Sequence, residues 1–384
     1  MLSTLTALGR SLVYSRQLVR YWGRKPIEVI DGLINDDDHV IVDPFGGSGS
    51  VVLEALRKGK RAVYADINPY AWLIAHVQIA GADPAEFNAA AGRAVRRARD
   101  IEGLIRRRTL PNDWLRYSDG APFVKRRNFD RVSQFFPREN FRKLLALLRA
   151  IDETTASVNT KLALYLAFAS SLYPSSLMKR RGSGSWGVPS YWAPQDNSPV
   201  DAYEAFGRSV KRIHGFLRKG RFYSVCYTDL CDADARLLLS NALSVEYHRD
   251  YTLITDPPFT DEIQYMELSF FYWAWLRVSA LPKIMASLVG RRAAFRFADE
   301  LVINENRGFD INVYINMFRR FLMRTKHVRR KVLIFHEENA GLLNAIREVI
   351  GEVWGQFEEK RFTLDIHRRV GPRGGNTYVV FIAE

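Results

Sequence analysis

The pattern that most constrains the fold is an apolar run that ends in a glycine-rich turn and leads into a helix-period stretch at 50–57. Val40-Ile-Val-Asp43 is followed by Pro-Phe-Gly-Gly-Ser-Gly49. Glycines let the backbone approach a ligand closely, and a helix that starts there presents free N–H groups. A second apolar run ends in Asp66, whose carboxylate suits the hydroxyls of a ribose. These runs predict a parallel α/β unit with a nucleoside-cofactor site.

Further short runs continue this alternation of strands and helices. We expect strands at 39–45, 61–68, 222–228, 251–257, 331–336, 362–368 and 376–383, with helices such as 50–57, 313–325 and 340–350 between them. Alternation of this kind is typical of a mostly parallel sheet covered by helices. Gly-Pro-Arg-Gly-Gly at 371–375 favours a closing hairpin. The sequence therefore predicts a doubly wound α/β fold with a terminal antiparallel hairpin.

The alternation fails between residues 81 and 220. This region shows helical patterns at 86–107, 138–151, 161–172 and 200–217, and an irregular stretch at 179–199 that is rich in Gly, Ser, Pro and Trp. We predict an inserted helical domain at 81–220. Residues 1–80 would form an N-terminal helix and the cofactor-binding half of the core, and 221–384 its catalytic half. A chain of 384 residues has room for such a division.

The chain is strongly basic, with 56 Lys and Arg against 42 Asp and Glu and a net charge of +14. Residues 91–150 hold 16 of the basic and 6 of the acidic residues. A basic patch favours a polyanionic partner, because each phosphate contact releases condensed counterions. A solvated helical face explains the same charge equally well. The charge alone leaves both interpretations open.

Composition argues against several other classes of protein. Cys226 and Cys231 form no Cys-x-x-Cys pair, so we expect neither a disulfide framework nor a metal site. No run approaches the roughly 18 apolar residues of a membrane span. The first twenty residues lack the pattern of a cleaved leader. We therefore expect a soluble, cytoplasmic protein with no membrane partner.

A second motif, Asp256-Pro257-Pro258-Phe259, ends another apolar run. Ligands of open α/β sheets bind at the carboxyl ends of the strands. The two prolines stiffen the backbone and remove two N–H donors, which leaves carbonyl groups to accept hydrogen bonds. The aromatic ring that follows suits stacking on a planar base. A simple strand-ending turn is the alternative, but it leaves Asp256 and Phe259 unexplained.

The two motifs together resemble those of S-adenosylmethionine-dependent methyltransferases that act on amino groups in DNA, at adenine N6 or cytosine N4. Asp43-Pro44-Phe45-Gly-Gly47-Ser-Gly49 resembles their cofactor motif, and 256–259 resembles their catalytic tetrad. The resemblance implies a methyltransferase fold, S-adenosylmethionine as cofactor and a flipped target base. Along this chain the cofactor motif comes first, followed by a long insertion and then the tetrad. This order is similar to that of adenine enzymes that have a target-recognition domain between the two motifs.

The resemblance also implies roles for individual residues. Those expected at the cofactor are Lys25, Pro26, Asp43, Pro44, Phe45, Gly47, Gly49, Asp66, Ile67 and, near the adenine amino group, Asp232. Gly46 falls where relatives vary, and we expect this departure to be compatible with activity. Asp256, Pro257, Pro258 and Phe259 would be catalytic, and Tyr265 would line the target pocket. Basic residues expected to contact DNA phosphates are Lys125, Arg126, Arg127, Lys179, Arg180 and Arg181. The aromatic run at 270–275 is expected mainly in the core.

Adenine N6 in DNA is the preferred target, since relatives that act on cytosine more often carry Ser where this chain has Asp256. Three alternatives stay open: a cytosine-N4 DNA methyltransferase, an RNA methyltransferase acting on guanine N2 or adenine N6, and a non-catalytic nucleic-acid-binding protein. No recognisable RNA-binding module precedes the core, which favours DNA. Intact Asp43, Asp66 and Phe259 argue against loss of catalysis. Partners from a restriction or phage-defence system also remain open, as does nucleoid association.

Overall fold

The computed structural model describes residues 18–19, 21–23, 27–182, 190–228, 231–258, 263–291, 293, 295–336, 339–363 and 377–384. The chain forms two compact units. The sheet unit comprises the described residues of Gly23–Trp72, Ser224–Gln264 and Phe295–Glu384. The helical unit comprises those of Met1–Trp22, Leu73–Tyr223 and Tyr265–Ala294.

An eight-stranded sheet with the order β3-β4-β2-β1-β5-β6-β8-β7 forms the base of the sheet unit. Its strands are β1 (Val40–Asp43), β2 (Arg61–Asp66), β3 (Val225–Cys226), β4 (Ala235–Leu239), β5 (Thr252–Thr255), β6 (Arg330–Phe335), β7 (Glu358–Thr363) and β8 (Thr377–Ala383). Neighbours from β3 to β6 pair in parallel, whereas β8 runs antiparallel to β6 and β7. The prediction of a mostly parallel α/β sheet with a closing antiparallel pair is confirmed. The glycine-rich turn predicted at 371–375 lies outside the described residues.

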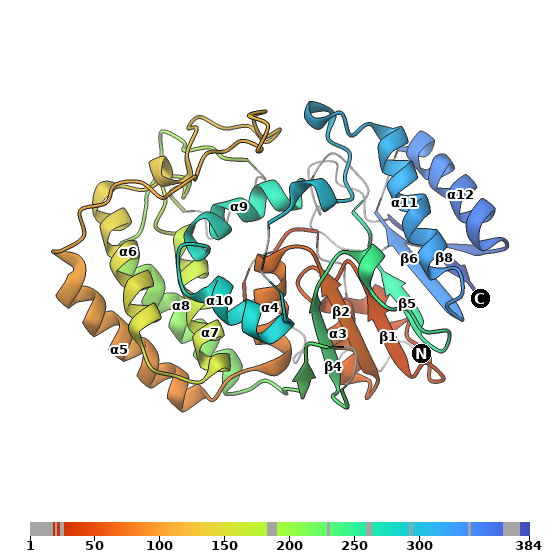
Figure 1. Cartoon of the computed structure of the whole chain (residues 1–384), viewed down its shortest axis with the longest axis horizontal. Coiled ribbons are helices and arrows are strands. Elements are labelled where there is room, and N and C mark those ends of the chain that lie inside the picture. Colours follow the sequence, from red (N-terminus) through yellow and green to blue (C-terminus); the bar gives the residue numbers. More distant parts are fainter. Residues whose placement is uncertain are drawn as a thin grey trace. The chain divides into compact units, whose positions relative to one another are not determined.

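Helices cover this sheet, and the central strands β1, β5 and β6 are buried at every position. The helical segments of the sheet unit are α2 (Ile27–Asp31), α3 (Ser50–Arg57), η2 (Ala242–Ser244), η3 (Phe297–Asp299), η4 (Glu305–Arg307), α11 (Ile311–Thr325) and α12 (Ala340–Trp354). Phe318 and Phe321 of α11 and Ile346 of α12 join Val42 and Leu333 of the sheet in one buried core. Figure 1 shows α11 and α12 beside β6 and β8. Helix α3 contacts strands β1 and β2.

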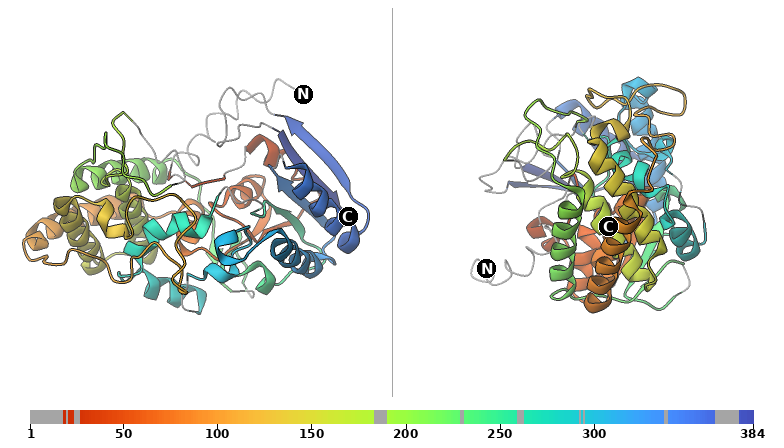
Figure 2. Two further views of the ribbon diagram at one scale, coloured as in Figure 1. Left: turned by 90° about the horizontal axis from the view of Figure 1, so that it is seen from above. Right: turned by 90° about the vertical axis from the view of Figure 1, so that its left-hand side faces the viewer.

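The helical unit contains α5 (Pro84–Glu102), η1 (Val132–Phe135), α6 (Arg138–Glu153), α7 (Val158–Leu172), α8 (Ala202–Leu217), α9 (Tyr265–Leu276), α10 (Leu281–Val289) and most of α4 (Pro69–Ala80). Helices α5 to α8 pack side by side, as Figure 2 shows in orange, yellow and green. They fall within the region expected to be a helical insertion.

Helix α9 belongs to the helical unit, whereas the sequence led us to expect it within a catalytic half at 221–384. Its aromatic side chains explain the difference. Phe271 stacks on Phe136 at 5.5 Å, and Trp275 meets the rings of Phe136 and Phe141 at 5.0 and 5.1 Å. Burying these rings favours packing against η1 and α6. Their interpretation as core residues is confirmed, since Phe270, Phe271, Tyr272, Trp273 and Trp275 are all buried.

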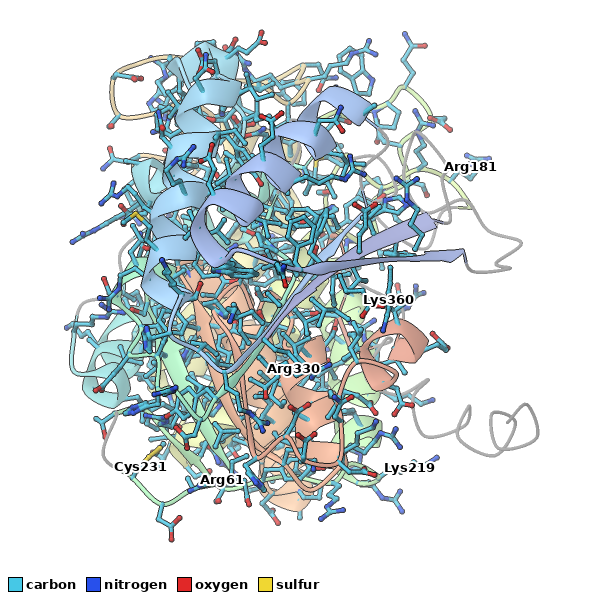
Figure 3. All side chains as sticks on the ribbon, turned by 90° about the vertical axis from the view of Figure 1, so that its right-hand side faces the viewer. Arg61, Arg181, Lys219, Cys231, Arg330 and Lys360 are labelled. Carbon is cyan, nitrogen blue, oxygen red and sulfur yellow. A yellow bond between two sulfur atoms is a disulfide. The ribbon has the colours of Figure 1, made fainter. Side chains whose placement is uncertain are left out.

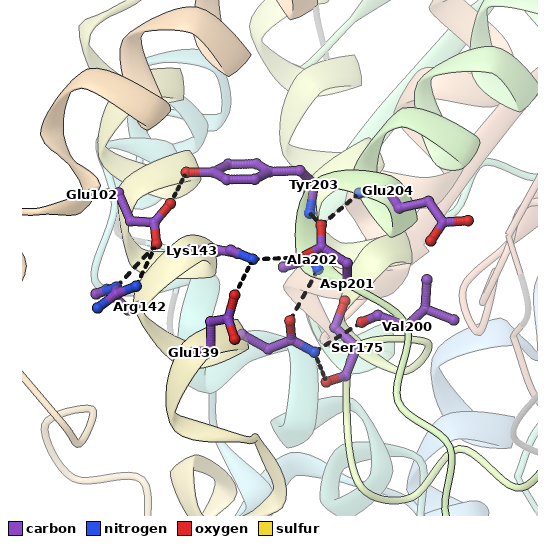
Figure 4. Close-up of polar contacts among 11 residues, drawn as sticks. Glu102, Glu139, Arg142, Lys143, Ser175, Val200, Asp201, Ala202, Tyr203 and Glu204 are labelled. Carbon is purple, nitrogen blue, oxygen red and sulfur yellow. Dashed lines mark hydrogen bonds and ion pairs between the residues drawn. The ribbon is translucent and has the colours of Figure 1, made fainter.

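A polar network joins α6 to the start of α8. Figure 4 shows the Lys143 ammonium between Glu139 and Asp201, at 2.6 Å from the Asp201 carboxylate. The buried Asn140 amide donates to the carbonyl oxygens of Ser175 and Val200 at 2.9 and 2.8 Å. Its oxygen accepts the N–H of Ala202 at 3.1 Å, the first residue of α8. One side chain therefore satisfies three backbone groups of the helical unit.

Replacing Asn140 by alanine should lower the free energy of unfolding by about 1–3 kcal/mol, because buried backbone groups lose their partners. Urea denaturation followed by circular dichroism measures the change. Lys143→Met is the matched control, since its ion pairs are partly exposed and such pairs contribute about 0–1 kcal/mol. Equal losses in the two variants would contradict this account of Asn140.

Candidate active site

Three carboxylates meet at the carboxyl edge of the sheet unit. Asp43 and Asp66 are the last residues of β1 and β2, and Asp256 directly follows β5. These strands are parallel neighbours in the order β2-β1-β5. The charges of Asp256 and Asp66 both raise the pKa of Asp43, as expected for carboxylates at close range. The sequence-predicted cofactor and catalytic motifs are therefore brought together.

Asp43 links the cofactor strand to the catalytic strand. The Thr255 hydroxyl of β5 donates to Asp43 Oδ1 at 2.6 Å, and the N–H of Phe45 donates to the same oxygen at 3.2 Å. Burial raises the pKa of Asp43 to about 7, against the lowering effect of these two hydrogen bonds. Phe45 itself packs its ring edge-on against Phe321 of α11, at 5.0 Å. Asp43 therefore has a structural role at the centre of the site.

Asp66 is held rigidly by backbone N–H groups. Its Oδ2 accepts from Gly47 at 2.8 Å and its Oδ1 accepts from Asn68 at 2.8 Å. Burial raises the pKa of Asp66 to about 6, while the N–H groups of Asn68, Gly47 and Ile67 lower it. A carboxylate has about four acceptor positions, so both oxygens retain capacity for a further donor. The arrangement can hold a vicinal pair of hydroxyls.

The glycine turn lies directly against β2. Gly46 N–H donates to the Ala65 carbonyl at 2.9 Å, and the Tyr64 hydroxyl donates to the Gly47 carbonyl at 2.8 Å. A Cβ atom on Gly46 would lie 2.3 Å from the Tyr64 ring. Gly47 and Gly49 have φ of 50° and 83°, a region that favours glycine. Only a hydrogen atom fits between the backbone of Gly46 and the Tyr64 ring, so the turn requires glycine at this position.

Gly46→Ala should displace the turn, destabilise the fold by about 1–3 kcal/mol and weaken cofactor binding. Thermal unfolding and calorimetric titration measure the two effects. Gly207→Ala in α8 is the control, because open space surrounds that position and alanine favours a helix. A Gly46→Ala protein with wild-type stability and affinity would contradict the close packing of this turn.

Three hydrogen bonds hold described residues that follow β5. The Tyr314 phenol, buried on α11, donates to the Pro258 carbonyl at 2.8 Å. The Gln264 amide donates to the Ile303 carbonyl at 2.9 Å and accepts from the Asn304 amide at 3.0 Å. Helix α11 therefore contacts the motif at Pro258, and the stretch that leads into α11 contacts Gln264. Phe259, the last residue of the predicted tetrad, lies outside the described residues.

Asp232 does not join this group. It is exposed and precedes β4, and the register pairs Ala235 with Ala62 near the start of β2 and Leu239 with Asp66 at its end. Figure 3 shows Cys231 and Arg61, the first residue of β2, toward the same end of the sheet. The assignment of Asp232 to the cofactor is therefore corrected: it lies at the amino edge. The residue beside Asp66 is Ser240, whose N–H donates to the Asp66 carbonyl at 2.9 Å.

The two cysteines also depart from expectation. Cys226 of β3 and Cys231 form a disulfide, with Cα atoms 6.4 Å apart. The two residues are only five positions apart in the sequence. The sequence argument against a disulfide relied on a framework of several pairs, which one short loop does not require.

Tyr265, the predicted pocket residue, is the first residue of α9 in the helical unit. Its ring stacks on that of Tyr21 at 5.9 Å, and Tyr21 in turn packs on Trp22. Tyr21 shortly precedes Lys25 and Pro26, which were expected at the cofactor and lie outside the described residues. The roles of these residues stay predictions.

Both predicted basic triplets flank one irregular segment of the helical unit. Arg126 and Asn128 pair through backbone hydrogen bonds with Tyr191 in the segment 190–198. On the other side, Lys179 accepts from Ser198 at 2.7 Å and Arg181 donates to Asp196 at 3.3 Å. The structure thus assembles Lys125–Arg127 and Lys179–Arg181 around a shared stretch of backbone.

Residues Val124–Asp130, which we call the basic loop, line a cavity of about 460 Å³. The Arg126 guanidinium lies over the Trp192 ring at 3.9 Å. Arg127 instead turns back into the loop, where it donates to the Phe123 carbonyl at 3.1 Å and lies 3.6 Å from Asp130. Arg126 therefore presents its charge, while Arg127 braces the loop.

Part of the basic excess at 91–150 is used within the helices. Arg97 of α5 pairs with Glu153 of α6 at 2.7 Å, and Arg142 of α6 pairs with Glu102 of α5 at 2.8 Å. These pairs are partly exposed and join neighbouring helices. The helical-face interpretation of the charge therefore applies to α5 and α6, while contact of the basic loop with a polyanion stays a prediction.

Comparison with known families bears on this site. Residues 24–119 match the family model of the D12 class N6 adenine-specific DNA methyltransferases. No curated protein and no solved structure matches the chain. Within the part of the chain that the structure describes, no helix is long and apolar enough to cross a membrane, and no three His, Cys, Asp or Glu residues form a potential metal site. The matched residues include Asp43, the glycine turn and Asp66 at the centre of the site.

Proposed function

We propose that the protein transfers a methyl group from S-adenosylmethionine to the N6 amino group of adenine in DNA. The observation that carries this proposal is the convergence of Asp43, Asp66 and Asp256 at one edge of the sheet, beside the glycine turn. The D12 match over 24–119 supports adenine as the target.

The residues present fit the cofactor. The Gly46–Gly49 turn brings bare backbone to the edge of the sheet, and a Cβ at Gly46 has no room there. Asp66 would accept the two ribose hydroxyls, since its carboxylate is already oriented by Gly47 and Asn68. Ser240 and Asn241, which follow β4 beside Asp66, replace Asp232 as our candidates for the adenine end. S-adenosylmethionine supplies an electrophilic methyl group on its sulfonium.

Asp256 and the Pro257 carbonyl would orient the nitrogen that accepts the methyl group. An exocyclic amino group is a poor nucleophile because its lone pair is delocalised into the ring. Two acceptors that hold its N–H bonds favour a pyramidal nitrogen with its lone pair directed at the methyl group. Tyr314 would keep the prolines in place through the Pro258 carbonyl. Phe259 would stack on the flipped base.

The helical unit would recognise and grip the DNA. Lys125, Arg126, Lys179, Arg180 and Arg181 are the candidate phosphate contacts, with Arg127 as a brace for the basic loop. A concentrated basic surface of this kind suits the duplex backbone. A protein with this activity would work at the nucleoid.

The nucleosides of a host that lacks its own adenine methylation test the proposal. DNA from cells expressing the protein should contain N6-methyladenine, and DNA from cells expressing the Asp256→Ala variant should not. N4-methylcytosine in place of N6-methyladenine would support the cytosine alternative. Methylation confined to RNA would contradict the assignment to DNA.

A further inference from the structure

We propose that Glu267 is a positioning residue that holds the basic loop in the conformation that binds DNA. The inference rests on the proposed function and adds to it a residue that positions the DNA-binding loop. Glu267 lies on the first turns of α9, the first described helix after the Asp-Pro-Pro motif. Its side chain is fully buried within the helical unit.

The Glu267 carboxylate accepts hydrogen bonds from the basic loop and from the strand-like segment before it. Oε1 accepts from the N–H of Val124 at 2.9 Å and from the Tyr117 hydroxyl. Oε2 accepts from the N–H of Lys125 at 3.1 Å. Burial raises the pKa of Glu267, whereas these three hydrogen bonds and the charge of Lys125 lower it. Three converging donors suit an acceptor-only, ionised carboxylate.

A second connection runs through the backbone of the same residue. The Tyr191 hydroxyl donates to the Glu267 carbonyl and accepts from the N–H of Phe271 at 3.1 Å. Phe271 follows Glu267 by one helical turn, so the phenol inserts into the hydrogen-bond ladder of α9. Burial raises the pKa of Tyr191 well above its ordinary value and keeps it a donor. The Tyr191 N–H donates to the Arg126 carbonyl at 2.7 Å, and the Tyr191 carbonyl accepts from the N–H of Asn128 at 3.2 Å, so the Tyr191 backbone holds the basic loop on either side of Arg127.

One turn of α9 therefore fixes the basic loop twice, through the Glu267 carboxylate and through Tyr191. A fixed backbone gives the charges of Lys125 and Arg126 a constant spacing. Phosphates along a DNA strand are regularly spaced, so a fixed loop binds them without a cost of ordering. A buried carboxylate is expensive to desolvate, which makes a purely space-filling role for Glu267 a poor explanation.

The test is Glu267→Gln, which keeps the shape of the side chain but points an NH2 group at N–H donors. We expect the Kd for duplex DNA to rise about tenfold, the effect of losing one hydrogen bond to a charged group. The dependence of Kd on salt should flatten, because fewer phosphate contacts form at once. Cofactor affinity and the single-turnover rate at saturating DNA should stay within about twofold of the wild type. Tyr117→Phe removes one of the hydrogen-bond donors to Glu267 and should raise the Kd for DNA by a smaller factor. This variant tests the proposal if Glu267→Gln does not fold.

Asp152→Asn is the matched control. Asp152 Oδ1 also accepts from a phenol and a backbone N–H in the helical unit, Tyr165 at 2.6 Å and Ala280 at 3.1 Å. We expect Asp152→Asn to reduce stability without changing the Kd for DNA. Two results would overturn the role of Glu267: wild-type DNA affinity in both Glu267→Gln and Tyr117→Phe, or an equal loss of DNA affinity in Asp152→Asn. In either case, methylation of DNA by the wild-type protein would leave the proposed function intact. A wild-type protein that binds no DNA would instead refute the proposed function, and this inference with it.

Discussion

Replacing Asp256 by alanine is expected to slow methyl transfer at least about a hundredfold while leaving cofactor affinity nearly unchanged. In the proposed mechanism the Asp256 carboxylate acts on the target nitrogen, and its hydrogen bond strengthens as that nitrogen becomes pyramidal. Interactions of this type appear in the rate of the chemical step rather than in binding. Single-turnover transfer of labelled methyl to DNA measures the rate, and calorimetry measures the cofactor.

Asp250→Ala is the matched control for this variant. Asp250 is an exposed carboxylate that precedes β5, whereas Asp256 follows that strand at its carboxyl end. The control should transfer methyl groups at the wild-type rate. An Asp256→Ala protein that is as fast as the control would exclude Asp256 from the chemistry.

Replacing Asp66 by alanine should raise the Kd for S-adenosylmethionine at least about tenfold for each ribose hydrogen bond lost, since such charge-assisted bonds contribute on the order of 1.5–3 kcal/mol. The variant also loses the acceptor of the Gly47 and Asn68 N–H groups, which loosens the glycine turn. Calorimetric titration measures the affinity. Asp232→Ala, at the amino edge of β4, should bind the cofactor as the wild type does.

The affinity should also depend on pH. Burial raises the pKa of Asp66 to about 6, and only the ionised carboxylate accepts both ribose hydroxyls. Affinity should therefore rise as pH increases through about 6 and fall below it. Asp43, whose pKa burial raises to about 7, titrates in the same range, so Asp43→Asn must be compared with Asp66→Asn. A pH dependence that survives in Asp66→Asn but disappears in Asp43→Asn would contradict the assignment to Asp66.

The sheet and the centre of the site follow from local sequence signals. The apolar run before Asp43, the glycine turn and the run ending in Asp66 each specify their own conformation, and the parallel pairing of β1 with β2 follows from the helix between them. The Asp-Pro-Pro motif likewise marks the end of its own strand. Local pattern therefore suffices to predict that Asp43, Asp66 and Asp256 share one edge.

Strand β4 was not predicted, and the error at Asp232 follows from it. Ala235–Leu239 contains no β-branched residue, so its sequence lacks the usual strand signal. Without β4, the acidic residues after β3 are the nearest candidates for the position beside Asp66. The register with β2, a tertiary property, instead pairs Leu239 with Asp66 and puts Ser240 next, where its N–H donates to the Asp66 carbonyl.

Contacts between distant segments carry the remaining features of the site. Tyr314 reaches Pro258 across 56 residues, and the Tyr117 hydroxyl reaches Glu267 across 150. A single sequence shows no pattern that pairs such positions. The close approach of Tyr64 to Gly46 is equally invisible, because it depends on how the turn returns over β2.

Labelling of unmethylated duplex DNA by the purified protein tests the central claim most directly. The protein is incubated with S-adenosylmethionine carrying a labelled methyl group, and the DNA is digested to nucleosides. The proposed function predicts label in N6-methyladenine, and no label when Asp256→Ala replaces the wild type. Label in 5-methylcytosine, or DNA that stays unlabelled while RNA is methylated, would contradict it.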